Sequence, residues 1–175
     1  MMICLQRFNL YLALAAVLAL LCGCQTGKNK EPMAALRIHI QTNPDSIGMS
    51  QQVRVMRDEP VLITIAHTPI LTEANLTSAK VINVPGGFAI ALQFDETGSW
   101  TLEQYSAANP GGHFVIFGQW GDKLKDGRWL AAPIITQRIS NGLLVFTPDA
   151  SRDEANQLVL GLTNAIKKIH KHDLK

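Results

Sequence analysis

The feature that most constrains this chain is a series of short strand-like runs separated by turn residues. Each run alternates apolar and polar residues or is rich in β-branched side chains, as strands are. Eight such runs cover residues 36–41, 53–56, 61–66, 80–84, 88–94, 114–118, 129–139 and 143–147. Because short turns such as residues 57–60 and 85–87 join neighbouring runs, these strands are expected to pair antiparallel.

The C-terminal stretch predicts a long helix. Ser151 and Glu154 have the spacing of a capping box, in which each side chain accepts a hydrogen bond from the other residue's backbone N–H. Apolar residues then recur at helical spacing and form one stripe, which comprises Ala155, Leu158, Val159, Leu162, Ile166 and Ile169. The stripe predicts that this helix packs on the sheet.

A second helix is expected to begin near Asp95 and to stop at Asn109-Pro110, with Trp100 packing from helix to sheet, and a short helical turn to begin at Thr72. Helices separate from the hairpins, without strict strand–helix–strand alternation, predict an α+β fold. We therefore expect two layers, a mainly antiparallel sheet with helices packed on one face, ending in the long helix.

The N-terminus has the pattern of an export signal. Arg7 precedes an apolar run at residues 10–21, which is too short for a membrane span of about 20 residues but suits a signal peptide. Leu21-Cys22-Gly23-Cys24 follows, and this order resembles the lipobox of bacterial lipoproteins. The resemblance implies cleavage after residue 23 and acylation of Cys24 with chains such as palmitate, whereas a plain secretory signal is the alternative.

The remaining chain is expected to form one exported domain. Residues 24–35 predict the lipidated cysteine and a flexible polar tether, and residues 36–175 a single domain. Only Cys24 would remain in the mature chain, so no internal disulfide can form. The formal net charge of +2 and the lack of a dense basic run argue against nucleic-acid binding. Gln25 after the cysteine favours the periplasmic side of the outer membrane over the inner membrane, by resemblance to enterobacterial sorting.

From about residue 69 to 166, a series of landmarks falls in a characteristic order. They are Pro69-Ile70-Leu71-Thr72, Asn75-Leu76 with Ala79, Phe94-Asp95 with Gly98, Asp126-Gly127-Arg128, Ala132-Pro133-Ile134-Ile135, Asn141-Gly142 and Asp153-Glu154-Ala155. Together they resemble the periplasmic P1 head of the SecD/SecDF protein-export subunits. That resemblance implies a compact α+β head that contacts translocating polypeptide. Ala131 and Asn141 depart from the serine and glycine that the family carries.

Catalytic motifs are not found in the sequence, so the chain is not expected to be an enzyme and no cofactor is expected. His39 is expected to face solvent from an alternating strand, and His67 and His113 to lie in a loop and at a strand start. Three imidazoles can hold zinc, but the spacing of these residues does not indicate a metal site. A hydrolase or metal-binding protein therefore stays a third hypothesis that needs these histidines to converge with an acid.

The stretch from residue 125 to 142 carries the remaining candidate site. Asp126-Gly127 and Asn141-Gly142 predict a tight turn and a hairpin turn around one strand, in which Pro133 marks an edge or a bulge because it has no N–H to donate. Trp120, Arg128 and Trp129 flank a long polar loop. The tryptophans either cover one another or the sheet edge, or they form a partner-contact surface with Arg128 and Pro133.

These observations favour a lipid-anchored, non-enzymatic binding or accessory module in the bacterial envelope. It would attach to the membrane through Cys24 and contact a protein or an extended peptide, in possible connection with protein export. The alternative is a structural subunit of an envelope complex that holds no transient ligand.

Overall fold

The computed structural model describes residues 31–44 and 48–173. The signal peptide, Cys24 and most of the tether lie outside these residues. The strands are β1 (Ala35–Ile40), β2 (Ser50–Val55), β3 (Val61–Ala66), β4 (Leu71–Thr72), β5 (Leu76–Val84), β6 (Gly87–Phe94), β7 (Phe114–Trp120), β8 (Asp126–Ala131) and β9 (Leu143–Phe146). The helices are η1 (Glu73–Asn75), α2 (Glu96–Ala108), η2 (Asp122–Leu124) and α3 (Arg152–Asp173).

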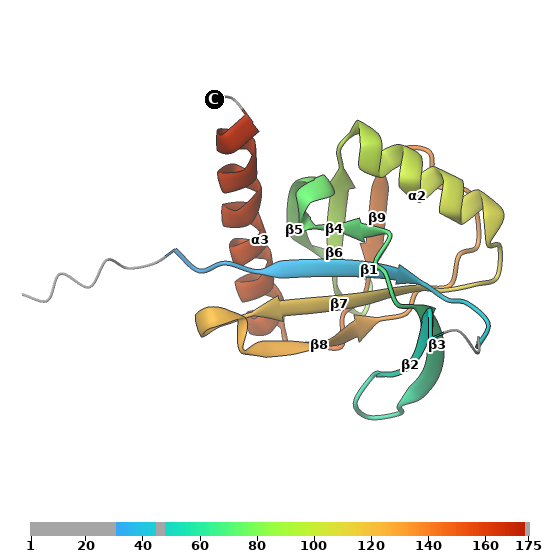
Figure 1. Ribbon diagram of the computed structural model, residues 1–175. Helices are drawn as coiled ribbons and strands as arrows, with labels where there is room; N and C mark the ends of the chain where they lie inside the picture. Colours follow the sequence, from blue (N-terminus) through green and yellow to red (C-terminus); the bar gives the residue numbers. More distant parts are fainter. Residues whose placement is uncertain (1–30, 45–47, 174–175) are drawn as a thin grey trace, which may run out of the picture. The chain divides into compact units, whose positions relative to one another are not determined.

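The strands form three antiparallel sheets, and the predicted α+β class is confirmed (Figure 1). Their orders are β4-β1-β7-β8, β2-β3 and β5-β6-β9. The helix α3 packs on β1 and β7 of the first sheet and on β5 and β6 of the third, whereas α2 packs on β4 and β6. The strands of the two larger sheets and both helices thus enclose one apolar core.

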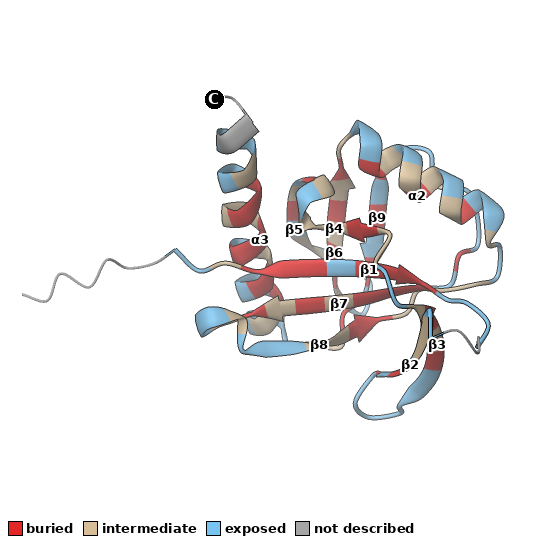
Figure 2. Cartoon of the chain, in the orientation of Figure 1, coloured by how far each residue is buried: buried red, intermediate tan, exposed pale blue. Residues whose placement is uncertain are grey.

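Local sequence signals set the helix ends as predicted. The Ser151 hydroxyl accepts from the Glu154 N–H at 3.2 Å, and the Glu154 carboxylate accepts from the Ser151 N–H at 2.8 Å, so the capping box is formed. Asp95 caps α2 through a 2.6 Å bond from the Gly98 N–H. Thr72 caps the short helical turn η1. Figure 2 shows the buried stripe of α3 turned toward the sheets.

The expectation that Trp100 packs between helix and sheet is wrong. Its side chain is 66% exposed, whereas Gly98, Leu102 and Ser106 are the buried residues of α2. These three residues, each four positions from the next, define the inner face of the helix, and Trp100 lies outside it. The aromatic residue alone therefore did not indicate the buried face.

The hairpin β2–β3 covers the far side of β1 and β7. Alternate hairpin residues Val53, Val55, Ile63 and Ile65 pack on Val115 and form a second, smaller core. His39, expected to face solvent, is therefore buried at 4% exposure. The prediction treated one face of β1 as solvated, and the hairpin that covers this face comes from a later part of the chain.

The stretch from residue 125 to 142 is built differently from the prediction. Asp126 and Gly127 lie inside β8, paired with Trp120 and Gln119, and the turn lies earlier, at Gly121 with φ +78°. The strand ends at Ala131 instead of continuing to residue 139. Asn141-Gly142 does not join two paired strands, because β8 and β9 belong to different sheets. Gly142 still needs its flexibility, with φ +65° at the entry to β9.

Pro133 lies where an edge position was predicted. The strand β8 is the last strand of its sheet, and Leu130 is an extra residue in its pairing with β7, which makes a bulge. Two residues beyond the end of β8, the carbonyl of Pro133 accepts a 3.1 Å bond from the Phe114 N–H. Pro133 thus accepts a hydrogen bond through its carbonyl. Its lack of an N–H breaks no bond between β7 and β8, because it lies beyond the end of β8.

Candidate functional site

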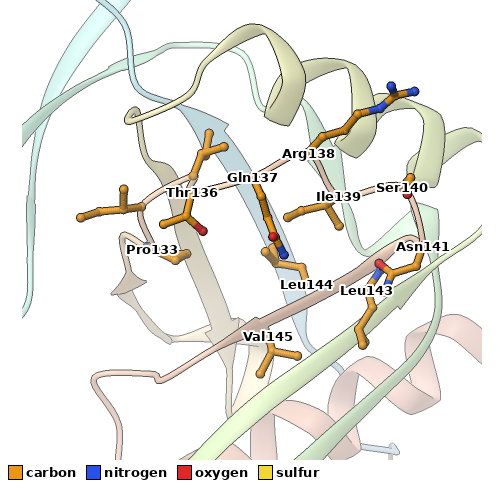
Figure 3. A pocket seen from close by; sticks show the side chains of 12 residues that line it. Pro133, Thr136, Gln137, Arg138, Ile139, Ser140, Asn141, Leu143, Leu144 and Val145 are labelled. Atoms are coloured by element: carbon orange, nitrogen blue, oxygen red, sulfur yellow. The ribbon is translucent and has the colours of Figure 1, made fainter.

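A groove of about 450 Å³ lies between residues 133–141 and β9. Figure 3 shows the side chains that surround it, which come from both elements. Its lining includes Pro133, Gln137, Ile139, Leu143, Leu144 and Val145. The volume falls within the range of ligand-binding clefts, about 300–1,000 Å³. Arg138 also lines the groove, but its guanidinium is paired with the Glu103 carboxylate. The remaining mixture of apolar side chains and amide or hydroxyl groups suits a polypeptide better than a highly charged ligand.

One wall of the groove is the free edge of β9. Among the described residues, the order β5-β6-β9 leaves β9 with a strand neighbour on one side only. The Phe94 N–H donates to the Gly142 carbonyl at 2.9 Å, and Leu92 faces Leu144 two residues on. Because antiparallel pairs alternate between bonded and non-bonded, Val145 directs its N–H and C=O away from β6. Its side chain is also 42% exposed.

The opposite wall is held by hydrogen bonds at several points. Ile135 and Gly112 join through an N–H···O bond of 2.8 Å, and the Ile139 N–H donates to the Ser106 hydroxyl at 2.9 Å. The Arg138 guanidinium pairs with the Glu103 carboxylate on α2. These bonds tie the segment to α2 and to the loop before β7. The groove therefore exists before any ligand arrives, which lowers the entropic cost of binding.

Among the four residues predicted to contact a partner, Pro133 lines this groove and the other three do not. Trp120 is 3% exposed in the main core, so the idea of an exposed patch that includes it is wrong. Trp120 alternates with Gln119 along β7, and its side of the strand faces α3. Arg128 covers its ring at 5.0 Å and shields it from water.

The position of Arg128 is set by α3. Its guanidinium pairs with the Glu154 carboxylate, the same group that closes the capping box. The hydrogen bond from the Ser151 N–H lowers the pKa of Glu154 most, burial opposes this, and Arg128 lowers it further. Arg128 therefore links β8 to the start of α3. Trp129, one residue on, points to the other face and contacts Phe117 at 5.0 Å and His39 at 5.4 Å.

The histidines do not form a metal site within the described residues, where no group of three metal-ligating side chains occurs. His113 contacts the Gln41 side-chain oxygen at 2.6 Å. The Nδ1–H of His39 donates to the Ala66 carbonyl at 2.8 Å and so joins β1 to the hairpin. Burial is the main cause that lowers the pKa of His39. The hydrogen bond to the Ala66 carbonyl raises this pKa, whereas charge repulsion from Arg37 and His67 lowers it further.

His39 is expected to make the fold less stable in mild acid. The unfolded chain takes up a proton at an ordinary pKa of about 6.5, while the folded chain resists it. The free energy of unfolding therefore falls as the pH drops from 6.5 toward the lowered pKa of His39. Urea titrations between pH 7.5 and 5 should show a shallower slope for His39→Gln. The exposed His170→Gln should keep the full slope, and equal slopes in both variants would contradict this account.

The sequence reasoning missed Leu143 and Val145. Both were placed in a strand, but a hairpin partner was assumed for that strand across Asn141-Gly142. The sequence did carry a signal: Leu143 and Val145 are both apolar and alternate along a strand that was expected to have one solvated face. The structure exposes both side chains. An apolar outer face at an edge is what a partner strand would cover.

Comparison with known proteins defines the family. Residues 50–166 match the family described as the SecDF P1 head subdomain. The chain belongs to the SecDF P1 head family. The match begins at β2 and ends within α3. It includes the hairpin, α2, the part of α3 up to residue 166, and every strand of the two larger sheets except β1. The expected resemblance began at residue 69, and the match extends it toward the N-terminus to include the hairpin.

Two solved SecDF structures share the fold. One is a membrane component SecDF that enhances protein export, with 21% identity, a TM-score of 0.51 and 75% of this chain covered. The other is SecDF in a super-membrane-facing form, with 21% identity, a TM-score of 0.52 and 75% covered. The alignments span 63% and 19% of those two chains, less than two thirds of either. No curated protein matches this P1 head chain. Within the described residues, its helices are too short or too polar to cross a bilayer.

Proposed function

We propose that this chain is a non-enzymatic accessory module of the bacterial envelope that holds extended polypeptide in the groove along β9. The observation that carries the proposal is the free edge of β9, where Val145 offers an unpaired N–H and C=O beside a preformed groove. A polypeptide can bind such an edge by adding a strand, so backbone hydrogen bonds give affinity for many sequences. Membership of the P1 head family supports a connection with protein export.

The proposal also includes an anchor. Cys24, lipidated after removal of residues 1–23, would attach the folded body to the periplasmic side of the bacterial envelope, with the outer membrane favoured. Residues 25–30 would belong to the tether. The folded body starts close to residue 32, since the Pro32 carbonyl accepts a 2.9 Å bond from the Asn164 amide on α3 and Ala34 is buried.

Strand addition predicts a residue-specific pattern of hydrogen exchange. The Val145 N–H faces outward in the free protein and should exchange quickly, whereas the Leu144 N–H already faces β6. Saturation with a reduced and alkylated, unfolded secretory polypeptide should slow exchange at Val145 at least tenfold and leave Leu144 little changed. Binding without new protection at Val145 would rule out strand addition at this edge.

Replacing Val145 with proline should weaken binding of the same polypeptide about tenfold. The substitution removes the outward N–H, worth about 1 kcal/mol, and places a ring where the new strand would lie. The ladder to β6 does not use this N–H, so the fold should persist, as circular dichroism can verify. Val145→Thr keeps the N–H and should bind within about twofold of the parent. A well-folded V145P protein with parental affinity, measured by fluorescence anisotropy, would refute the proposed site.

A further inference from the structure

A second pocket, of about 420 Å³, lies between the hairpin and β8, on the side of β8 where Trp129 points. Its apolar surface comes from Met56, Phe117 and Trp129, and its rim carries Arg54 and Arg57. Gly127 forms part of the floor, where a Cβ atom would lie 3.2 Å from the Phe117 ring. The glycine therefore keeps the pocket open. The groove along β9 uses none of these residues.

The charges around this pocket are only partly neutralised. The Arg57 Nε lies 3.1 Å from an Asp149 carboxylate oxygen, and its backbone N–H donates to the same carboxylate at 2.9 Å. Arg128 is paired with Glu154. Arg54 is exposed, and its guanidinium has no hydrogen-bond or ion-pair partner within the described part of the chain. Arg57 and Arg128 are thus each paired with a carboxylate. The positive charge of Arg54 is left for a ligand.

The wall beside Arg54 is also conformationally unusual. Met56 has φ +69°, a left-handed backbone conformation that residues other than Gly, Asn and Asp rarely adopt. Its side chain is 48% exposed, at the end of a hairpin that also exposes Val61 and Leu62. Strain of this kind persists only where the surrounding structure holds it, and it concentrates at binding sites. The flexible Met56 side chain and the rings of Phe117 and Trp129 together form a surface that can accommodate different apolar side chains.

We propose that this pocket receives an acidic residue of a partner protein, together with the large apolar side chain beside it. Arg54 binds the carboxylate, and the apolar surface of Met56, Phe117 and Trp129 covers the neighbouring side chain. A carboxylate carries one negative charge and matches the single uncompensated arginine. A phosphate carries about 1.5 to 2 negative charges at pH 7, which would leave excess charge against Asp149 and Glu154.

The test uses capped six-residue peptides added to the isotopically labelled full chain. One peptide alternates leucine with glutamate, and matched copies carry glutamine or phosphoserine at the glutamate positions. The indole N–H signal of Trp129 reports on the pocket, and that of the exposed Trp100 on α2 serves as an internal control. The glutamate peptide should shift the Trp129 signal but not the Trp100 signal. It should bind at least fivefold more tightly than the glutamine copy.

Arg54→Gln should abolish the preference for glutamate over glutamine. Lys80→Gln makes the same change of charge on β5, outside the residues that line this pocket, and should keep the preference. Equal binding of the glutamate and glutamine peptides, an undiminished preference in R54Q, or tighter binding of the phosphoserine copy would each overturn the proposal. V145P should leave this binding unchanged, and R54Q should leave binding at β9 unchanged, so either site can fail without the other.

Discussion

Phe114→Ala is expected to lower the free energy of unfolding by about 3–5 kcal/mol, because it removes an aromatic ring from the centre of the core. Phe114 is 1% exposed, opens β7 and packs in the main apolar cluster. A loss of that size is a large share of the roughly 5–15 kcal/mol that stabilises a typical domain. At about 2–4 °C per kcal/mol, the thermal midpoint should fall by about 6–20 °C.

Phe88→Ala provides the matched control for this prediction. Phe88 lies at the start of β6, is only partly buried, and is covered by Arg152 at 5.2 Å. Its loss should cost clearly less, since partial burial means that less surface returns to water. Urea unfolding followed by circular dichroism measures both variants. If F114A were no less stable than F88A, the assignment of Phe114 to the core centre would be wrong.

Gly161→Ala is expected to destabilise the fold by about 1–3 kcal/mol, even though alanine is the better helix former by about 1 kcal/mol. Gly161 lies on the buried face of α3, where a Cβ would lie 2.7 Å from the Ala34 Cβ and 2.8 Å from the Ala34 nitrogen. Two of the three close atoms belong to the backbone of residues 33 and 34, so they cannot rotate away. The approach of the chain to β1 must therefore shift.

Two further variants separate the clash from helix propensity. Asn156→Ala changes an exposed position of the same helix and should stabilise the protein by a few tenths of a kcal/mol. Ala34→Gly in the G161A background removes one close atom but leaves the backbone contacts, so it should restore only part of the loss. Stabilisation by G161A, or full recovery in the double variant, would contradict this packing. Urea unfolding provides the measurement for all three.

Local signals predicted the elements of this fold well, and long-range packing decided the rest. The caps of α2 and α3 could be read from the sequence because each cap depends on residues three apart. The burial of His39 could not, because the hairpin that covers it pairs β2 with β3 more than ten residues later. Asp126-Gly127 has the residues of a turn, yet its pairing with β7 places it in a strand.

The candidate site was predicted only in part for the same reason. Pro133 indicated an edge because proline lacks a donor, and that property does not depend on distant residues. The free edge of β9 depends on which strand lies beside it, and the sequence suggested a hairpin partner across Asn141-Gly142. The strand before that dipeptide ends ten residues earlier, at Ala131, so the assumed partner does not exist. Trp129 is partly buried against the smaller core, and its contact with a partner stays a prediction. Trp120 could be recognised as buried only from the packing of α3 on β7.

The passage of the chain from β8 to β9 has a mechanical consequence. Residues 132–142 leave one sheet, run along the groove, and enter the other sheet as its edge strand. A polypeptide added along β9 and pulled along its own axis would load its hydrogen bonds together, in shear, instead of opening them one at a time from an end. The same pull would reach both sheets, through β9 and through the wall tied to α2. If polypeptide binds as proposed, it should therefore resist a pull along its own axis more strongly than a pull that peels it from one end.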